Sequence, residues 1–156
     1  MQTPATRALA DAGIDHRVLS YEHDPAAESY GIEAADALGL DPDQVFKTLL
    51  AELDTSELVV AIVPVSCRLD LKSLARLAGA KKAEMADPSR AEKVTGYVVG
   101  GISPLGQKKQ LRTFVDELAE LSDEIFVSAG RRGLDLGVGS AELVAVLDAT
   151  VGPIAR

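Results

Sequence analysis

Residues 45–65 read VFKTLLAELDTSELVVAIVPV, and they form the most strand-like stretch of the chain. Two runs rich in Val, Ile and Leu, at 45–53 and 57–65, flank the polar triplet Asp54, Thr55 and Ser56. Aliphatic and β-branched runs separated by a short polar segment are typical of two strands joined by a turn. The chain therefore contains at least one β-sheet, and this strand pair is its clearest element.

Weaker signals for strands and helices lie on both sides of this pair. Further strands are predicted at 16–21, 97–100, 111–115, 124–128 and 134–138, and helices at 4–12, 30–38, 71–78, 88–94 and 140–147. Helix N-caps are expected at Thr3, Asp70, Asp87 and Ser140, and helices are expected to end at Gly13, Gly39 and Gly79. The elements do not alternate as regular βαβ units, which favours a mixed α/β fold with helices flanking the sheet.

Composition places the chain among globular proteins of one domain. Its 156 residues are 47% hydrophobic and 26% charged, and they predict a single domain over residues 1–156. The sequence contains no apolar run of about 20 residues and no signal-peptide pattern, so we expect a cytoplasmic protein with no membrane partner. The net charge of −8 argues against a protein that holds phosphates over a wide surface, although an acidic protein can still act on the tip of a nucleic acid.

Few residues offer obvious chemistry. The two histidines and the single cysteine, Cys67, have no metal-ligand spacing, so we predict neither a metal nor a cofactor. Lys47 is more informative because it stands inside a strand with apolar neighbours. Such a lysine either extends to solvent or meets an anion, and alternation alone favours the solvent-facing orientation.

Two glycine-containing segments follow predicted strands. The first is Gly-Gly-Ile-Ser-Pro-Leu-Gly-Gln-Lys-Lys at 100–109, and the second is Ser-Ala-Gly-Arg-Arg-Gly at 128–133. Glycines allow a backbone to approach a ligand closely, and N–H groups with nearby cations suit a phosphate or an oxyanion. A plain surface loop and a hairpin turn with solvated arginines explain these segments equally well.

Taken together, these segments resemble the YbaK family of Cys-tRNA(Pro) deacylases, which is related to the editing domain of prolyl-tRNA synthetase. The resemblance rests on Phe46-Lys47-Thr48-Leu49, Glu84-Met85-Ala86, Thr95-Gly96-Tyr97, the run from Val99 to Lys109, the 128–133 turn and Thr3-Pro4-Ala5. It extends from Thr3 to about Leu147. It implies a mixed, barrel-like sheet and an enzyme that hydrolyses the ester between a wrong amino acid and the 3′ end of tRNA.

The resemblance also implies a site. Lys47 and Tyr21 take the positions of catalytic residues, and the substrate-binding positions fall on Thr48, Gly100, Gly101, Ser128 and Gly130. Asp135 aligns less securely and is not assigned. The implied partner is the 3′ end of a mischarged tRNA. The net charge of −8 and the local basic cluster at Lys108, Lys109, Arg131 and Arg132 add the hypothesis that prolyl-tRNA synthetase holds the tRNA body in a ternary complex.

The chain offers no evident nucleophile of its own for this reaction. The family account supplies one from the substrate, because the cysteinyl thiol attacks its own carbonyl and releases the tRNA. Two alternatives remain open. One is a deacylase for alanyl-tRNA(Pro) or another charged tRNA that uses water, and the other is a non-catalytic module of the same fold that docks a synthetase or a nucleotide.

Overall fold

The computed structural model describes residues 2–27 and 29–156. The helices are α1 (Pro4–Asp11), α2 (Tyr30–Leu38), α3 (Leu71–Ala78), α4 (Pro88–Thr95), the 3₁₀ helix η1 (Glu117–Leu121) and α5 (Ser140–Leu147). The strands are β1 (His16–Ser20), β2 (Phe46–Leu53), β3 (Leu58–Pro64), β4 (Ala83–Met85), β5 (Thr113–Asp116), β6 (Glu124–Arg131), β7 (Leu134–Gly139) and β8 (Thr150–Gly152). The mixed α/β fold predicted from the sequence is confirmed.

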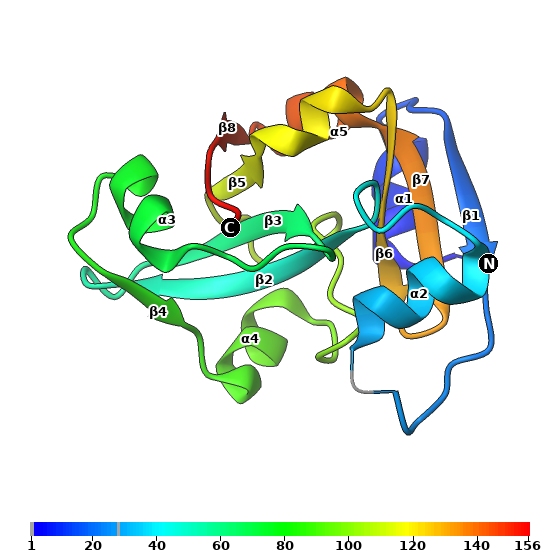
Figure 1. Cartoon of the computed structure of the whole chain (residues 1–156), viewed down its shortest axis with the longest axis horizontal. Helices are drawn as coiled ribbons and strands as arrows, with labels where there is room; N and C mark the ends of the chain where they lie inside the picture. The colour runs from blue at the N-terminus through cyan, green and yellow to red at the C-terminus, as the bar shows by residue number, and fades with distance from the viewer. Residues whose placement is uncertain (1, 28) are drawn as a thin grey trace.

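The strands form two sheets that meet at the start of β2 (Figure 1). One sheet has the order β4-β2-β3-β5-β8, with β3, β5 and β8 parallel and the β2 pairings antiparallel. The other is antiparallel, in the order β1-β7-β6. A bridge between Val45 and Phe126 joins them, where the Phe126 N–H donates to the Gln44 carbonyl at 2.9 Å. The sheets curl toward each other in this way without closing into a complete barrel.

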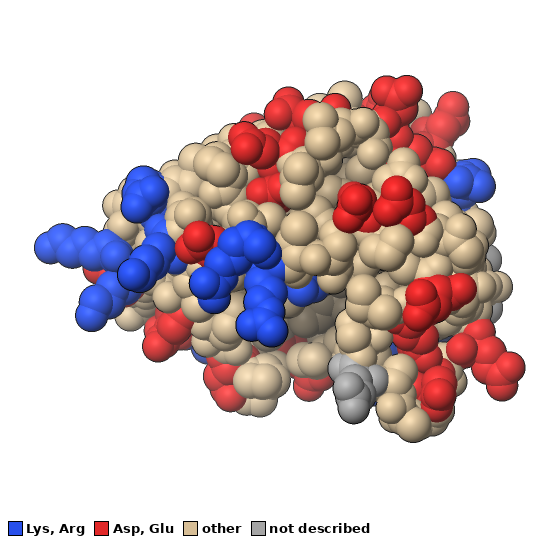
Figure 2. Space-filling model, viewed as in Figure 1, with Lys and Arg blue, Asp and Glu red and all other residues tan. Residues whose placement is uncertain are grey.

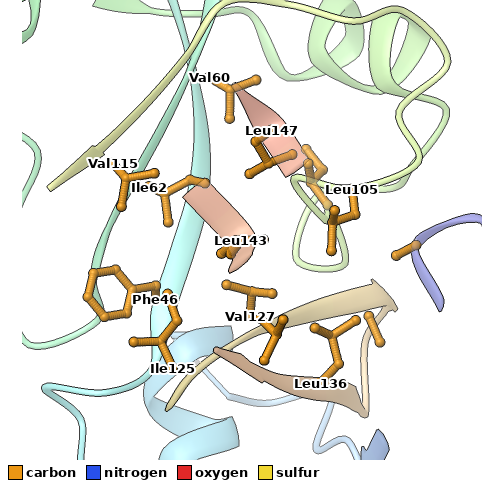
Figure 3. Packing of buried hydrophobic residues seen from close by; sticks show 14 of the residues in the cluster. Phe46, Val60, Ile62, Leu105, Val115, Ile125, Val127, Leu136, Leu143 and Leu147 are labelled. Atoms are coloured by element: carbon orange, nitrogen blue, oxygen red, sulfur yellow. The ribbon is translucent and has the colours of Figure 1, made fainter. Parts of the chain in front are cut away.

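The main core fills the space between the two sheets and is closed by α5 (Figure 3). Phe46 and Ile62 come from the first sheet, Val127 and Leu136 from the second, and Leu143 from α5. All five are buried, and each large aliphatic side chain removed from water contributes about 1.5–3 kcal/mol. A second cluster lies on the other face of β2 and β3, where Leu74 of α3 packs.

Local sequence explains where the helices begin and end. Thr3, Asp70 and Asp87 each accept a hydrogen bond from the backbone N–H three residues later, as predicted for N-caps. Gly39 and Gly79 end α2 and α3 with positive φ angles of 66° and 79°. These boundaries confirm the caps at Thr3, Asp70 and Asp87 and the ends at Gly39 and Gly79. The N-cap predicted at Ser140 is wrong, because Ser140 is the first residue of α5 and its hydroxyl donates to the Ser122 carbonyl at 2.7 Å.

The predicted strand at 97–100 is wrong. Residues 96–101 form bends and turns, and Gly100 has a φ of 89°, far from the extended backbone of a regular strand. Tyr97 is instead a buried anchor whose hydroxyl donates to the Leu105 carbonyl at 2.6 Å. The β-branched pair Val98 and Val99 gave a strand signal, but the segment has no partner strand within the described residues, and Tyr97 ties it down as a loop.

None of the helices in the described part of the chain is long and apolar enough to cross a membrane.

Candidate functional site

A cleft of about 360 Å³ opens between α2, the exposed edge of β2, α4 and the loop around Gly100. Figure 2 shows a hollow near the middle of this face of the molecule. Its lining is Ser29, Tyr30, Gly31, Ala34, Val45, Phe46, Lys47, Thr48, Leu49, Leu50, Met85, Ala86, Pro88, Ala91, Val99, Gly100, Ile102, Ser128 and Asp135. These residues come from both sheets, so the cleft forms only when the whole chain has folded.

The cleft runs along a stretch of β2 that no strand of the described chain covers. The β4 strand pairs with β2 only at residues 51–53, and the bridge from β6 to this segment is at Val45, before β2 begins. The backbone groups of odd-numbered residues in this segment point to β3. This follows from two hydrogen bonds, one from the Val65 N–H to the Val45 carbonyl and one from the Leu53 N–H to the Glu57 carbonyl. The backbone N–H and C=O of Thr48 therefore point to the uncovered edge, which lines the cleft.

Lys47 lies in this cleft as the sequence resemblance implies. Its side chain is half-buried, and within residues 2–27 and 29–156 its ammonium has no hydrogen-bond or ion-pair partner. Burial lowers the pKa of Lys47 below its ordinary value, and the nearby Arg68 guanidinium lowers it further, while Cys67 acts in the opposite direction. A partly desolvated cation without a counter-ion is suited to an anionic ligand.

Thr48 also lines the cleft and carries an unusual polar atom. Its Oγ1 is buried and has no hydrogen-bond partner, the one such side-chain atom among the described residues. An unpaired buried hydroxyl costs about 1–3 kcal/mol. That cost, together with the unpaired Thr48 backbone groups beside it, marks this point of the cleft as a place where a ligand would complete the hydrogen bonding.

Ser128 and Asp135 are paired across the β6–β7 ladder and both reach the cleft. Asp135 is only 6% exposed, and burial raises its pKa to about 7. A carboxyl group that titrates near neutral pH can accept a proton in one step of a reaction and return it in another. Sequence reasoning left Asp135 unassigned, although it is the single acidic residue in the apolar strand β7.

Tyr21, the second residue predicted to be catalytic, does not line the cleft. Its backbone N–H donates to the Gly133 carbonyl at 2.9 Å. Burial raises the pKa of the Tyr21 phenol, and the negative charge of Asp135 raises it further. Tyr21 is thus close enough to Asp135 to interact with its charge, which places it beside the site.

The three predicted glycines differ in their surroundings. Gly100 lines the cleft, with a φ of 89°. Gly101 packs against the Arg131 backbone, where an added Cβ would lie 2.7 Å from the Arg131 Cα, and its N–H already donates to the Val98 carbonyl at 2.9 Å. Gly130 has a φ of 114° and packs against the Tyr97 ring. Gly101 and Gly130 therefore hold the shape of the site, and neither lines the cleft.

Sequence reasoning missed the contribution of α2. Tyr30 at its first position lines the cleft, and the Arg132 guanidinium stacks over the Tyr30 ring at 4.6 Å. Arg132 also donates to the Val99 carbonyl, with 3.0 Å between its Nε and that oxygen. These contacts fix the Gly100 loop against α2. No local pattern signals them, because Tyr30, Val99 and Arg132 are far apart in sequence.

The sequence model of the aminoacyl-tRNA editing domain matches residues 24–146, which include every cleft-lining residue. This chain belongs to the aminoacyl-tRNA editing domain family. The family predicted from the sequence is confirmed.

Several editing relatives resemble most of the chain. EbsC of Enterococcus faecalis, named as a Cys-tRNA(Pro)/Cys-tRNA(Cys) deacylase, is 40% identical over 122 residues, which are 78% of this chain and 73% of EbsC. The multifunctional Ser/Thr-tRNA deacylase ProXp-y of Escherichia coli K12 is 31% identical over 126 residues, with the same two coverages. A proline–tRNA ligase of Nitratidesulfovibrio vulgaris strain DP4 is 35% identical over 115 residues, which are 73% of this chain and 18% of the ligase.

Solved structures of the editing family agree with this fold. The crystal structure of a trans-editing enzyme for prolyl-tRNA synthetase has a TM-score of 0.85 and 26% identity, and the match covers 100% of this chain and 99% of that one. The structure of the hypothetical protein APE2540 has a TM-score of 0.88 at 23% identity, and the match covers 99% of this chain and 100% of that one, which supports the fold alone.

Proposed function

We propose that this chain is a trans-editing deacylase that releases cysteine from Cys-tRNA(Pro), and also from Cys-tRNA(Cys), in the cytoplasm. The observation that carries the proposal is the 40% identity to EbsC over 78% of the chain, together with a cleft that lies wholly inside the matched editing domain. We further propose that residues 1–156 act as one editing domain. A proline pocket cannot easily reject an amino acid as small as cysteine, so a separate editing site has a clear use.

The cleft has the size and character that this substrate requires. A volume of about 360 Å³ lies at the small end of ligand sites, which suits an amino acid and the sugar that carries it. Apolar side chains such as Leu50, Ala86 and Ala91 surround the few polar groups. Lys47 supplies a cation and Asp135 a titratable carboxyl, and four residues supply hydroxyls: Ser29, Tyr30, Thr48 and Ser128.

Each reacting group has a candidate partner in the cleft. The substrate thiol gives its proton to the Asp135 carboxylate, and the thiolate attacks the carbonyl carbon of its own ester. The Lys47 ammonium stabilises the oxyanion that forms. The carbon–oxygen ester bond then breaks, and the ribose oxygen leaves with the proton held by Asp135, giving a cyclic thioester and free tRNA. Intramolecular attack benefits from effective molarities of about 10⁵ M or more, so the site needs mainly to orient the substrate.

The Gly101 N–H has a smaller role in this scheme than the sequence suggests. Its hydrogen bond to the Val98 carbonyl occupies it, so it is not a free donor for the oxyanion. Gly100 remains at the cleft wall, and Thr48 adds a hydroxyl and a backbone N–H on the facing edge of β2. We assign the binding of the aminoacyl group to these two walls.

Prolyl-tRNA synthetase is the proposed partner, holding the tRNA body while this chain edits its 3′ end in a ternary complex. The net charge of −8 supports this division of labour, because an acidic protein alone binds a long polyanion weakly. The match to a short part of a proline–tRNA ligase also supports it, since the same domain type occurs within that synthetase.

Single-turnover deacylation of three charged tRNA(Pro) substrates tests the proposal. Cysteinyl-tRNA should be cleaved fastest, and trapping of the released product should detect the cyclic thioester. Seryl-tRNA has nearly the same shape but a far weaker nucleophile, and alanyl-tRNA has none, so both should be cleaved slowly. The Cys67→Ala variant should match the wild type because Cys67 does not line the cleft. Equal rates for cysteinyl and alanyl substrates would instead assign the attack to water.

A further inference from the structure

Positive charge gathers at one end of this acidic molecule. Figure 2 shows Lys and Arg clustered toward the end of the molecule formed by α3 and β4, next to the central hollow, whereas Asp and Glu prevail at the opposite end. We name five of these residues the α3 basic strip: Arg68, Lys72, Arg76, Lys81 and Lys82. They are five of the 16 lysines and arginines of the chain, so the strip is positively charged although the net charge of the chain is −8.

The fold of α3 places these cations outward. Leu74, Ala75 and Ala78 are buried against β2 and β3, which turns the exposed Lys72 and Arg76 to solvent one helical turn apart. Lys81 and Lys82 follow on the connection to β4 and are also exposed. A shallow depression of about 660 Å³ lies among them, and no acidic residue of the described chain lines it.

The strip is not neutralised by ion pairs of its own. Three arginines outside it are paired, with Arg17 bound to Glu124, Arg90 to Glu52 and Arg112 to Glu57. Within the described residues, no carboxylate oxygen lies within 4.0 Å of a side-chain nitrogen of the strip. Two carboxylates contact only the backbone of the strip. Asp54 accepts hydrogen bonds from the N–H groups of Lys81 and Lys82, and Asp70, the N-cap of α3, accepts one from that of Lys72. The side-chain charges of Lys72 and Arg76 therefore remain available to a ligand.

The strip is continuous with the cleft. Lys47 pairs with Val63 in the β2–β3 ladder, and the chain leaves β3 at Pro64 to reach Arg68 within four residues. Arg68 is held there by two backbone hydrogen bonds with Arg156, each 2.8 Å long. The Arg68 charge acts on the Lys47 ammonium, and α3 begins three residues after Arg68. A line of cations therefore leads from the cleft across the end of β3 and onto α3.

We propose that the α3 basic strip binds the phosphate backbone of the acceptor stem whose 3′ end enters the cleft, an inference that rests on the proposed function. A polyanion that presents its end to Lys47 must continue over some neighbouring surface. A cationic surface gains binding free energy there because it displaces the counter-ions condensed on the polyanion. Contacts to phosphates carry no sequence information, so the strip positions the tRNA while the cleft selects the amino acid.

The basic cluster predicted at Lys108, Lys109, Arg131 and Arg132 is less suited to this role. Arg132 is occupied by the Tyr30 ring and the Val99 carbonyl. Lys109 lies in a separate depression that it shares with Arg90 and Glu57, whose carboxylate binds Arg112. The acceptor stem is therefore assigned to α3.

Two substrates separate the strip from the cleft. One is full-length Cys-tRNA(Pro), and the other is a cysteinylated CCA trinucleotide, which reaches the cleft but has no stem. The Lys72→Gln/Arg76→Gln variant should lower the ratio of kcat/KM for full-length over truncated substrate by about 10- to 30-fold near 0.15 M salt. The slope of log kcat/KM against log salt for full-length tRNA should become shallower by about 2, since each lost duplex phosphate contact removes about 0.9.

The matched control changes one arginine at a time, without synthetase present. Arg76→Gln should reduce the salt slope by about 1. Arg7 is exposed on α1, which packs against β6 of the other sheet, so Arg7→Gln should leave the slope unchanged. Wild-type protein that cleaves neither substrate would refute the proposed function itself. Wild-type cleavage with equal ratios and slopes in the double variant would refute the strip alone. A defect seen only when prolyl-tRNA synthetase is added would assign the strip to the synthetase and overturn this proposal.

Discussion

Replacing Lys47 by methionine should separate activity from stability. The side chain is half-buried in the cleft, and within the described residues its ammonium has no partner. Methionine keeps much of the length and apolar volume of the stem and removes only the charge. The substitution therefore tests the ammonium itself.

The expected loss of activity follows from the contact that the ammonium makes with the substrate. One charge-assisted contact to an oxyanion or a phosphate in a sheltered site is worth about 2.7–4 kcal/mol, which is a loss of about 10²–10³ in rate. Stability should move the other way. Burial lowers the pKa of Lys47, so the folded state binds its proton less tightly than the unfolded chain does. Below the folded pKa this opposes folding, and methionine removes that cost.

Single-turnover deacylation of Cys-tRNA(Pro) and thermal unfolding near pH 7 measure the two effects. The Lys47→Met protein should lose at least 100-fold in rate, with a Tm equal to or above that of the wild type. Lys93→Met, on the exposed last turn of α4, is the matched control and should retain its rate. A folded Lys47→Met protein with wild-type activity would remove Lys47 from the site, and a large fall in Tm would show that the lysine is structural.

Three further substitutions test the surroundings of Lys47. Because the Asp135 pKa is raised to about 7, the contribution of Asp135 to stability should be fully present below about pH 4 and fall by about 4 kcal/mol as pH rises to about 7; Asp135→Asn should remove this component of the pH profile in urea unfolding, and an unchanged pH profile would contradict the assignment. Thr48→Val should slow deacylation while leaving Tm equal or higher, since it removes an unpaired buried hydroxyl, and a lower Tm would reveal a hidden partner. Gly130→Ala should cost about 2–4 kcal/mol of unfolding free energy, because φ is 114° and the new Cβ would lie 2.8 Å from the Tyr97 ring; a neutral result would show that the ring yields.

The strands that sequence predicted well are those that supply the core. The runs at 45–53 and 57–65 became β2 and β3, and every residue of β3 is buried, which is why its composition is so aliphatic. The short strands β4 and β8 were not predicted, because three residues hold no periodic pattern. Their existence depends on pairing with β2 and β5, which local sequence does not record.

The site shows the same division between local and distant information. Alternation in β7 sets Leu134 and Leu136 toward the core, so it turns Asp135 to the opposite face, and this much is readable from the sequence. What the sequence does not give is that the opposite face meets α2 and β2. The orientation of Lys47 is a related case, since its side of β2 becomes a cleft only where β4 stops short of covering the edge.

The electrostatics of the cleft make sense only when the substrate is included. Burial lowers the pKa of Lys47 and raises that of Asp135, so the free protein pays to keep either group charged. The two groups line one cleft, yet neither acts detectably on the pKa of the other, so they are not an internal ion pair. In the proposed reaction, the aminoacylated end of the tRNA brings a phosphate or an oxyanion for the lysine and a thiol proton for the carboxylate. The cost of charging the two groups would then be recovered in the transition state, where it lowers the barrier, and not only in substrate binding.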